Sequence, residues 1–423
     1  MTRIIQAAPQ PPARSARHEG DRARQPTERT HRALQALNFF MADMQAGVGP
    51  FLGVFLMAHG WRSGWIGTVM TIGGTAGVIM TAPAGAWVDS SRHKRGLVVI
   101  TGVCTVLASA LIFASQSFWS IALSQVATAI AGAAIGPAVS GITLGIFRQS
   151  GFVRQNGLNQ AYNHAGNAVG AGLSGLLGWR FGLPAVFALA VLFAIASIAS
   201  VMMIPARAID DQAARGLSED HGGVQASGLE VLFRCKPLLL LAGALALFHL
   251  GNAAMLPLYG MAVAAGKQGN PAAVVGATIV VAQTTMIAMS FLALRLAQAR
   301  GYWLIMLVSF IALPVRAVVA ACLIKSWGVF PVQILDGVGA GLQSVAVPGL
   351  VARILDGTGR INVGQGAVMT AQGVGAALSP AVGGWLAQSS GYGTAFLVLG
   401  ALAVGSLLIW SRVHPSVTVD SHR

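Results

Sequence analysis

The chain has 423 residues, 55% of them hydrophobic and only 9% charged, with a mean hydropathy of +0.68. An ordinary soluble domain carries roughly 25% charged residues, so this composition excludes a soluble globular protein. The formal net charge of +14 would suggest nucleic-acid binding in a soluble protein. Here the charges lie in short loops and tails, where they set membrane topology. We therefore expect a lipid bilayer around the chain and no nucleic acid as a partner.

Residues 1–34 contain seven arginines and several prolines but no apolar run. A signal peptide would follow its charged start at once with an apolar stretch, so this segment is not one. Its composition indicates a disordered cytoplasmic tail, with a role of the arginines at the lipid surface as the alternative.

Apolar stretches follow along the rest of the chain, each about 20 residues long and therefore able to cross a bilayer as a helix. Only helices and closed barrels satisfy all backbone polar groups in lipid, and these stretches are far longer than barrel strands. We expect an all-α integral membrane protein with twelve transmembrane helices. The expected spans are 35–58, 63–87, 97–116, 119–146, 156–178, 183–204, 237–263, 272–294, 302–324, 328–350, 363–387 and 392–411.

The spans divide into two six-helix bundles, 35–205 and 237–412, with a central cytoplasmic loop at 206–236 and a tail at 413–423. If the N-terminus is cytoplasmic, 22 of the 27 Lys and Arg residues lie on the cytoplasmic side and four on the outer side. Cytoplasmic loops carry an excess of these residues, so we expect both termini inside.

The two halves of the sequence repeat each other. The matching pairs are Pro50–Gly53 with Pro257–Gly260, Gln125 with Gln333, and Gly157 and Gly166 with Gly366 and Gly375, at offsets of 207, 208 and 209. A slowly drifting offset is expected of a duplicated six-helix unit. Repeats of this kind are typical of secondary transporters, which bind substrate between the two halves.

A glycine, one acid and several basic residues end the second span. They lie in the stretch "GAWVDSSRHKR" and include Gly85, Asp89, Arg92, Lys94 and Arg95. This stretch resembles the conserved loop of the major facilitator superfamily, in which Gly-x-x-x-Asp precedes basic residues. Ser90 and Arg92 depart from that pattern, since a basic residue and a glycine are usual there. The resemblance implies that the loop gates the inward-facing state; a cluster that only sets topology is the alternative.

Two spans carry a similar ladder of glycines. It consists of Gly157, Gly166 and Gly170 in the fifth span, and of Gly366, Gly375, Pro380, Gly383 and Gly384 in the eleventh. The ladder resembles the glycine–proline signature of the superfamily's antiporters, which implies export. In the family that signature lies in the fifth helix, where Ala171 replaces the proline here. Close helix packing, which glycines permit in any membrane bundle, is the alternative.

One feature of the superfamily's proton-coupled drug exporters is missing. They carry an arginine in the fourth helix, where this chain has Gln125, and Gln333 takes the matching place in the tenth. This departure argues against a standard proton–drug antiport mechanism and makes Gln125 a candidate for the substrate path.

Charged side chains in lipid cost at least ~2.5 kcal/mol, so each needs a reason. Asp43, about two turns into the first span, could carry a proton or bond a neighbouring helix. On a helical wheel Asn38 and Gln45 share a face that Asp43 does not. These two amides are therefore the better pair for lining a cavity.

Lys325 lies in the turn between the ninth and tenth spans. Arg316 is nine residues before Lys325, and Asp336 is eleven residues after it. At about 1.5 Å per residue both lie at similar depth, which predicts an ion pair, either structural or part of the transport path. Asp336 shares a face with Gln343, which is a further candidate for the substrate path.

In the seventh span His249 and Asn252 lie one turn apart. A histidine can relay protons near neutral pH, and Asn252 is a candidate for the substrate path. The alternative is that His249 is a hydrogen-bonded structural residue of the bundle.

The fifth span carries a stripe of amides. Asn156, Gln160, Asn163 and Asn167 fall within about 40° of one line on a helical wheel, with His164 at its edge. We expect Asn163 and Asn167 to face a substrate path in the middle of the membrane. Amides that bond helix to helix are the alternative.

The sequence therefore predicts a bacterial inner-membrane transporter that works by alternating access of two halves. Proton-coupled efflux is favoured, with a nutrient symporter as the alternative and a membrane sensor as a third. The inferred cavity suits a small neutral or weakly polar solute. Since the chain shows no nucleophile–base pair, metal-ligand set or phosphate loop, we expect no enzyme activity and no cofactor beyond a proton gradient. We also expect a monomer.

Overall fold

The computed structural model describes residues 27–46, 48–215, 235–356, 358 and 360–413, and every regular element in these ranges is helical. The α-helices are α2 (Glu28–Ala46), α3 (Val48–Ala58), α4 (Ser63–Ser90), α5 (Lys94–Ala114), α6 (Phe118–Phe181), α7 (Leu183–Met202), α9 (Lys236–Asn252), α10 (Met255–Ala265), α11 (Pro271–Arg300), α12 (Tyr302–Cys322), α13 (Val329–Ile354), α14 (Ile361–Ser390) and α15 (Tyr392–Ser411). Three 3-10 turns accompany them, η1 (Ala206–Ala208), η2 (Ala213–Arg215) and η3 (Ser326–Gly328).

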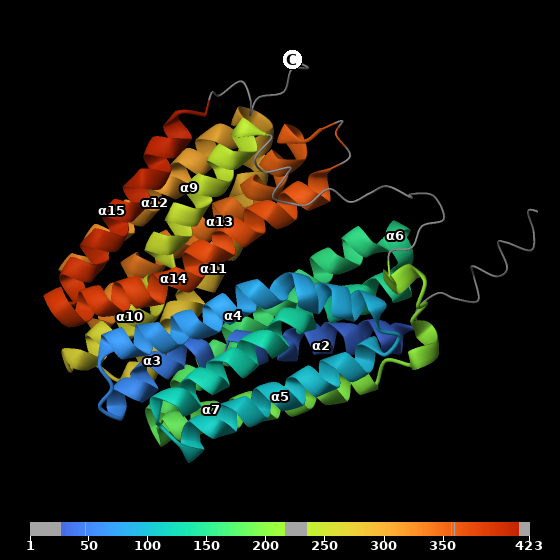
Figure 1. Ribbon diagram of the computed structural model, residues 1–423, viewed down its shortest axis with the longest axis horizontal. Helices are drawn as coiled ribbons and strands as arrows, with labels where there is room; N and C mark the ends of the chain where they lie inside the picture. The colour runs from blue at the N-terminus through green and yellow to red at the C-terminus, as the bar shows by residue number, and fades with distance from the viewer. Residues whose placement is uncertain (1–26, 47, 216–234, 357, 359, 414–423) are drawn as a thin grey trace, which may run out of the picture.

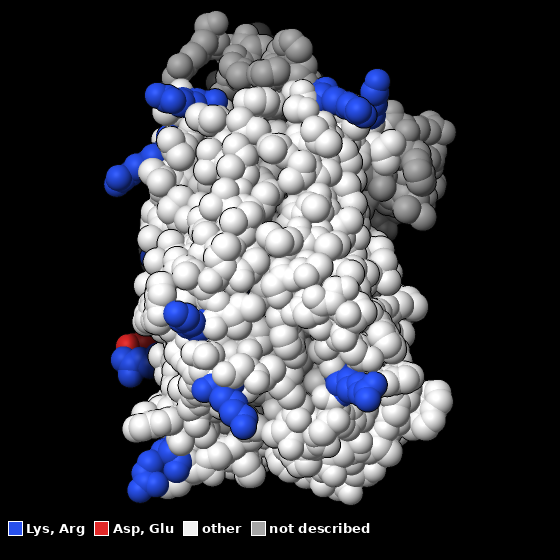
Figure 2. Space-filling model, turned by 90° about the vertical axis from the view of Figure 1, so that its left-hand side faces the viewer, with Lys and Arg blue, Asp and Glu red and all other residues white. Residues whose placement is uncertain are grey.

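The helices have the length and composition of membrane spans. Within the described ranges, nine helical segments could cross a bilayer. Large apolar side chains such as Leu107 and Phe181 remain exposed, as expected of a surface that faces lipid. One side of the molecule shows scattered Lys and Arg side chains and hardly any acidic ones (Figure 2). The all-helical class is confirmed, whereas the count of twelve spans and the orientation of the termini stay predictions.

Two predicted spans each correspond to two labelled helices. The first falls on α2 and α3, and residue 47 between them lies outside the described part. The seventh is divided into α9 and α10 at Ala253 and Ala254. Pro257 lies in the first turn after this break, and a proline cannot donate a hydrogen bond to the carbonyl four residues earlier.

A third difference joins two predicted spans. The helix α6 covers both 119–146 and 156–178, and Arg148, with a φ of 54° and a ψ of −176°, is the non-helical residue between them. The chain therefore turns from the fourth to the fifth predicted span at Arg148.

The first helix begins earlier than its predicted start at residue 35. Thr27 caps it, because the main-chain N–H of Thr30 donates to Thr27 Oγ1 at 3.3 Å. The predicted tail is therefore too long at its C-terminal end by the residues from Glu28 onward. Residues 1–26 lie outside the described part, as do 216–234 of the predicted central loop and 414–423 of the predicted C-terminal tail.

The helices α2 to α7 and α9 to α15 form two bundles that lie against each other (Figure 1). Between the bundles α4 packs along α14, α6 along α11, and α3 against α10. The ribbons meet where α3 and α10 lie and spread apart toward the end where α2 begins and α15 ends (Figure 1). We call the first of these the closed end.

The repeat in the sequence is also a repeat in packing. A Cβ atom added to Gly166 would overlap the main-chain carbonyl of Phe39, and one added to Gly375 would overlap that of Ala246. The glycines are 209 residues apart and their partners 207. Each bundle therefore holds two helices at backbone contact through a glycine, as membrane helices commonly do.

Candidate functional site

The closed end is held by two seams between the bundles. In the first seam, between α4 and α14, a Cβ atom at Gly67 would overlap the carbonyl of Pro380. Ser63 Oγ donates to the carbonyl of Gly384 at 3.1 Å, and the N–H of Ala381 donates to Thr71 Oγ1 at 3.0 Å. The proline of the eleventh predicted span therefore lies where the two bundles touch.

The second seam joins α6 to α11 in the same way. A Cβ atom at Gly276 would lie 2.7 Å from the carbonyl oxygen of Ala171 and 2.7 Å from Gly175 Cα. Gly276 is 209 residues after Gly67, and Ala171 is 209 residues before Pro380. The two seams are thus equivalent positions of the repeat.

The predicted glycine ladder has mixed surroundings. Gly384 lies in the first seam, whereas Gly383 packs inside its own bundle, where an added Cβ would lie 2.6 Å from Leu258 Cδ1. Gly170 is buried. Added Cβ atoms at Gly157 and Gly366 would meet nothing within 4 Å, so close packing does not explain those two glycines.

The amide stripe of the fifth predicted span lies between α2 and α11. Asn163 Nδ2 donates to the carbonyl of Asn38 at 3.5 Å, and Asn167 Nδ2 donates to Asn163 Oδ1 at 3.3 Å. His164 faces the other bundle, with its Nδ1 3.2 Å from Gln283 Oε1. Because an amide oxygen can only accept, His164 Nδ1 is the donor.

The stripe forms bonds between helices, and it is not fully enclosed; its place on a substrate path stays a prediction. Asn163 bonds helix to helix, but Asn163, His164 and Asn167 remain only partly buried, and Gln160 is exposed. Asn38 is buried, and its amide donates to the carbonyl of Leu34 in its own helix at 2.8 Å. The side chain of Asn38 thus serves its own helix.

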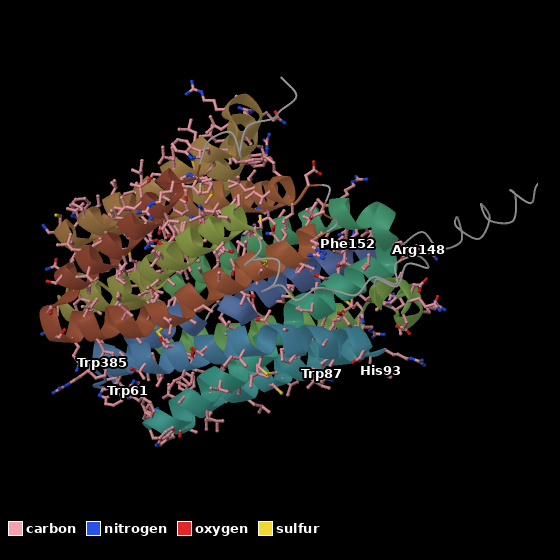
Figure 3. The ribbon with its side chains drawn as sticks, turned by 45° about the horizontal axis from the view of Figure 1, so that its top comes forward. Trp61, Trp87, His93, Arg148, Phe152 and Trp385 are labelled. Carbon is pink, nitrogen blue, oxygen red and sulfur yellow. The ribbon has the colours of Figure 1, made fainter. Side chains whose placement is uncertain are left out.

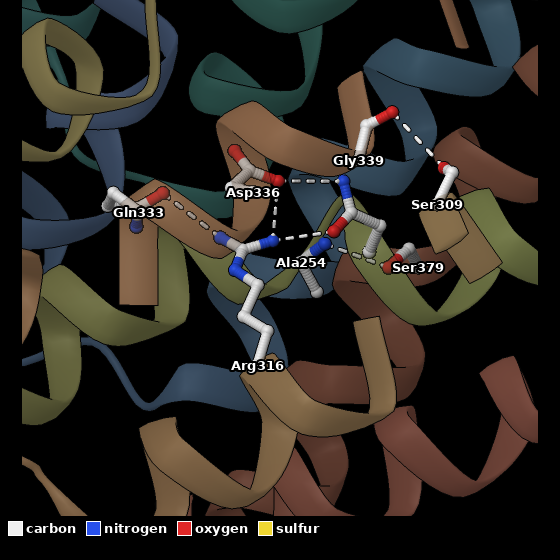
Figure 4. Close-up of polar contacts among 8 residues, drawn as sticks. Ala254, Ser309, Arg316, Gln333, Asp336, Gly339 and Ser379 are labelled. Atoms are coloured by element: carbon white, nitrogen blue, oxygen red, sulfur yellow. Dashed lines mark hydrogen bonds and ion pairs between the residues drawn. The ribbon is translucent and has the colours of Figure 1, made fainter. Parts of the chain in front are cut away.

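A buried charge cluster joins α9, α12 and α13 in the C-terminal bundle (Figure 4). Arg316 Nη1 donates to Asp336 Oδ1 at 2.7 Å and to Asn252 Oδ1 at 2.5 Å, and Arg316 Nη2 donates to Gln333 Oε1 at 3.2 Å. Asn252 Nδ2 also donates to Asp336 Oδ1 at 3.2 Å. The ion pair expected from equal depth is present, with side chains only 1% exposed for Arg316 and 15% for Asp336.

Two further predicted residues lie close to this cluster. His249 Nε2 is 3.3 Å from Gln372 Nε2, which joins α9 to α14. Gln343 is buried, and its amide donates to Ser309 Oγ of α12 at 2.9 Å. The helix α12 covers the side of α13 that carries Gln343. Gln343 therefore faces the interior of its own bundle.

Three other predicted path or coupling residues lie in the N-terminal bundle. Gln125 is partly buried beside Gly73, where an added Cβ would lie 2.9 Å from the Gln125 Cβ. Asp43 and Gln45 lie in the last turns of α2, and their side chains fall outside the described part.

The predicted gating loop closes the end of α4. Lys94 is buried, and its Nζ donates to the carbonyls of Val88 at 3.0 Å and Ser91 at 3.2 Å. Arg95 donates from Nη2 to the carbonyl of Met202 at 3.1 Å. These basic groups satisfy carbonyls that the helix ends leave free.

The other three residues of this loop differ from Lys94 and Arg95. Asp89 and Arg92 are exposed, and an added Cβ at Gly85 would meet nothing within 4 Å. The loop lies at the end opposite the closed end, as the positions of His93 and Trp61 show (Figure 3).

Two hydrogen-bond partners of the histidines were not predicted as site residues from the sequence. Gln283 and Gln372 were only individual polar residues in apolar spans, yet each reaches a histidine. Gln372 follows Asn163 by 209 residues, so the repeat offset would have singled it out. Gln283 has Gly74 at the matching place, and no signal in the repeat marks it.

Comparison with known proteins places this geometry in a family. A family model described as Major Facilitator Superfamily matches residues 34–315, more than half of the chain. Two curated proteins from two strains of Mycobacterium tuberculosis, both described as uncharacterized MFS-type transporters, are each 38% identical over 396 residues. The match covers 93% of this chain and 94% of each relative.

Solved structures share the fold at much lower identity. The nucleoside transporter NupG has a TM-score of 0.72 at 14% identity, and a point mutant of it has 0.73 at 15%. Each match covers 90% of this chain and 98% or 99% of the other. At such identity the likeness concerns the arrangement of helices alone.

Proposed function

The chain belongs to the major facilitator superfamily of membrane transporters, which are not enzymes, and on that premise we propose that it exports a small neutral or weakly polar solute in exchange for protons. The observation that carries this proposal is that the uncharged polar side chains and the charged ones lie in different places. The imidazole of His164 and the amide of Gln283 meet at the contact between the bundles, and Asn167 donates to Asn163 on the same helix as His164. The Arg316–Asp336 pair lies inside one bundle. The solute site is therefore uncharged, and the titratable carboxylate is separate from it.

The closed end supports alternating access. Backbone-to-backbone contacts at the two seams bring the bundles together at the closed end, while the ribbons spread toward the other end (Figure 1). In the predicted topology the closed end is the outer one, so this arrangement is the inward-facing state. Rocking of one bundle against the other would open the seams and expose the amides to the outside.

We assign the coupling proton to Asp336. Its side chain is 15% exposed, and Asn252, from which it accepts a hydrogen bond, is the last residue of α9 before the break at Ala253 and Ala254. A proton on Asp336 would weaken its bond to Arg316 and change the charge at that break. His249 lies one turn before Asn252 and is the relay that we assign to this carboxylate; Asp43 is the second acid to test.

The proposal also covers the membrane in which the protein lies, its oligomeric state and the role of the loop after α4. We place the protein in a bacterial inner membrane as a monomer, with the loop at 85–95 steadying the cytoplasmic end of α4. The carbonyl bonds of Lys94 support that assignment.

Uptake of a nutrient by proton symport is the second candidate. It is favoured by one observation: the similar folds include a nucleoside transporter, and a nucleoside is a neutral solute rich in hydrogen-bonding groups. The amides of the stripe would suit it as well as an exported solute.

A vesicle experiment separates the two candidates. The purified full-length protein is reconstituted into liposomes, and labelled nucleosides, sugars and neutral amides are supplied outside. Exchange with protons predicts accumulation when the lumen is the more acidic side. Accumulation only when the outside is more acidic would show symport and refute export. Liposomes with the Asn163→Ala and Asn167→Ala double variant serve as the matched control for passage through the amide site.

A further inference from the structure

The first turn of α4 faces two different surroundings at the closed end. Ser63 and Gly64 hold the first seam: Ser63 Oγ donates to the carbonyl of Gly384 at 3.1 Å, and the N–H of Gly64 donates to Gln388 Oε1 at 3.1 Å. The residues on either side of them, Trp61, Arg62 and Trp65, line a hollow of about 620 Å³ together with Phe118 and Trp119. The same turn therefore forms both the seam and the hollow.

Aromatic rings form a continuous wall in this hollow. Phe118 stacks on Trp61 with ring centroids 6.3 Å apart and contacts Trp65 edge-on at 5.5 Å and Trp119 at 5.2 Å. Trp65 contacts Trp385 of the other bundle at 5.6 Å. The wall therefore reaches across the seam, and Trp61 and Trp385 lie at the same end of the molecule (Figure 3).

The rings of this wall are open to the surroundings. Trp119 is 78% exposed and Trp65 is 47% exposed. The hollow lies where the chain passes from the end of α3 to the start of α4. This is the edge of two membrane spans, which is the level of lipid headgroups. A lipid is therefore the molecule that is always present beside it.

The charge of the hollow selects among lipids. Arg62 supplies a guanidinium, and no other described residue forms a hydrogen bond or ion pair with it. A guanidinium binds phosphate through paired hydrogen bonds. The faces of Trp rings attract an ammonium group. A headgroup with a phosphate and an ammonium a few bonds apart would satisfy both.

We propose that this hollow binds the headgroup of a zwitterionic phospholipid, such as phosphatidylethanolamine, and that this binding stabilises the first seam. The phosphate bonds Arg62, and the ammonium lies against the rings of Trp65 and Trp119. Opening the seam moves the first turn of α4 away from α14 and so separates Trp65 from Trp385. The lining of the hollow belongs to the N-terminal bundle, and Trp385 of the other bundle supports Trp65 only while the seam is closed. A headgroup that binds Trp65 in this position therefore shifts the population toward the closed seam. This proposal depends neither on the direction of transport nor on its coupling.

Binding of soluble short-chain lipids to the full-length protein in detergent tests the site. We expect dioctanoyl phosphatidylethanolamine to bind, and Arg62→Gln to weaken its affinity about tenfold, the usual effect of losing one charge-assisted bond. Trp119→Leu should weaken it as well. Arg180→Gln and Trp327→Leu remove an arginine and an exposed tryptophan elsewhere and should leave the affinity unchanged.

Three results would overturn the assignment. Equal affinity of wild type and Arg62→Gln would reduce the hollow to an ordinary aromatic belt. Equally tight binding of dioctanoyl phosphatidylglycerol would show that the ammonium is not recognised. Equally tight binding of phosphoethanolamine, which lacks acyl chains, would identify a soluble ligand in place of a lipid.

A distance measurement tests the link to the seam. Spin labels are placed at His59→Cys and Ser390→Cys, one in each bundle, after Cys104, Cys235 and Cys322 are replaced by alanine. We expect dioctanoyl phosphatidylethanolamine to enrich the shorter distance in the wild-type background and to have no effect with Arg62→Gln. Lipid binding without any change in the distances would contradict the link to the seam.

Discussion

The N-terminal and C-terminal bundles place the same close contacts at matching positions, but they differ in buried charge. Gly166 meets a backbone carbonyl in one bundle as Gly375 does in the other. The C-terminal bundle also holds an ion pair between the buried Arg316 and the partly exposed Asp336. An offset of 208 places Ala108 and Thr128 at the corresponding positions of the N-terminal bundle.

The difference indicates what the ion pair is for. In the N-terminal bundle Ser124 Oγ donates to the carbonyl of Ala108 at 2.6 Å, so the helices equivalent to those of the ion pair pack together without charges. A buried ion pair is seldom more stabilising than apolar residues of similar volume. The glycine contacts recur in both bundles, whereas the charges occur in one, and this difference supports our proposal that the ion pair takes part in transport.

The largest effect on stability should come from breaking the ion pair of the C-terminal bundle. Arg316→Met leaves Asp336 buried without its partner, which costs roughly 3–5 kcal/mol. We expect a marked fall in the temperature of thermal unfolding. Adding Asp336→Leu should restore most of the stability but no proton-driven transport. A stable, fully active double variant would show that the pair has no part in transport.

The symmetric side of the comparison predicts equal effects in the two bundles. Gly166→Ala and Gly375→Ala each push a Cβ atom into a backbone carbonyl. Overpacking of this kind costs about 1–3 kcal/mol, and we expect both variants to lose similar stability in thermal unfolding. Gly157→Ala and Gly366→Ala, where space is open, are the matched controls. Destabilisation in only one bundle would contradict equivalent packing.

Variants of the amide stripe should change solute binding and have little effect on stability, unlike variants of the ion pair and the glycines. Asn163→Ala and Asn167→Ala remove partly buried hydrogen bonds worth about 1 kcal/mol each. We expect the concentration for half-maximal transport to rise several-fold in each variant, while the unfolding temperature barely moves. Normal transport by both variants would make the stripe a structural feature.

Much of this architecture could be predicted from the sequence. The repeat offsets located equivalent residues, and equal depth beside Lys325 was sufficient to pair Arg316 with Asp336. Both signals depend on distances along the chain, which helices convert directly into depth in the membrane. The break before Pro257 could also have been predicted, since a proline removes a main-chain donor.

Partners across helices were harder to predict. A helical wheel places Gln343 on the face of Asp336 but cannot say that α12 covers it and that Ser309 accepts its bond. The same limit applies to Lys94, which was assigned to a gating loop without any sign that its side chain bonds main-chain carbonyls. Neighbouring helices decide these contacts, and their rotation is not written in the spacing of one helix.

The most direct test of the central claim, that Asp336 couples proton movement to a symmetric rocking scaffold, is transport by Asp336→Asn in liposomes. Asparagine keeps an oxygen for Arg316 but cannot be charged. We expect this variant to exchange labelled solute for unlabelled solute at close to the wild-type rate, yet to build no gradient when the lumen is acidified. Thr128→Val, at the matching place in the other bundle, should do both as the wild type does. Proton-driven accumulation by Asp336→Asn at the wild-type level would contradict the claim.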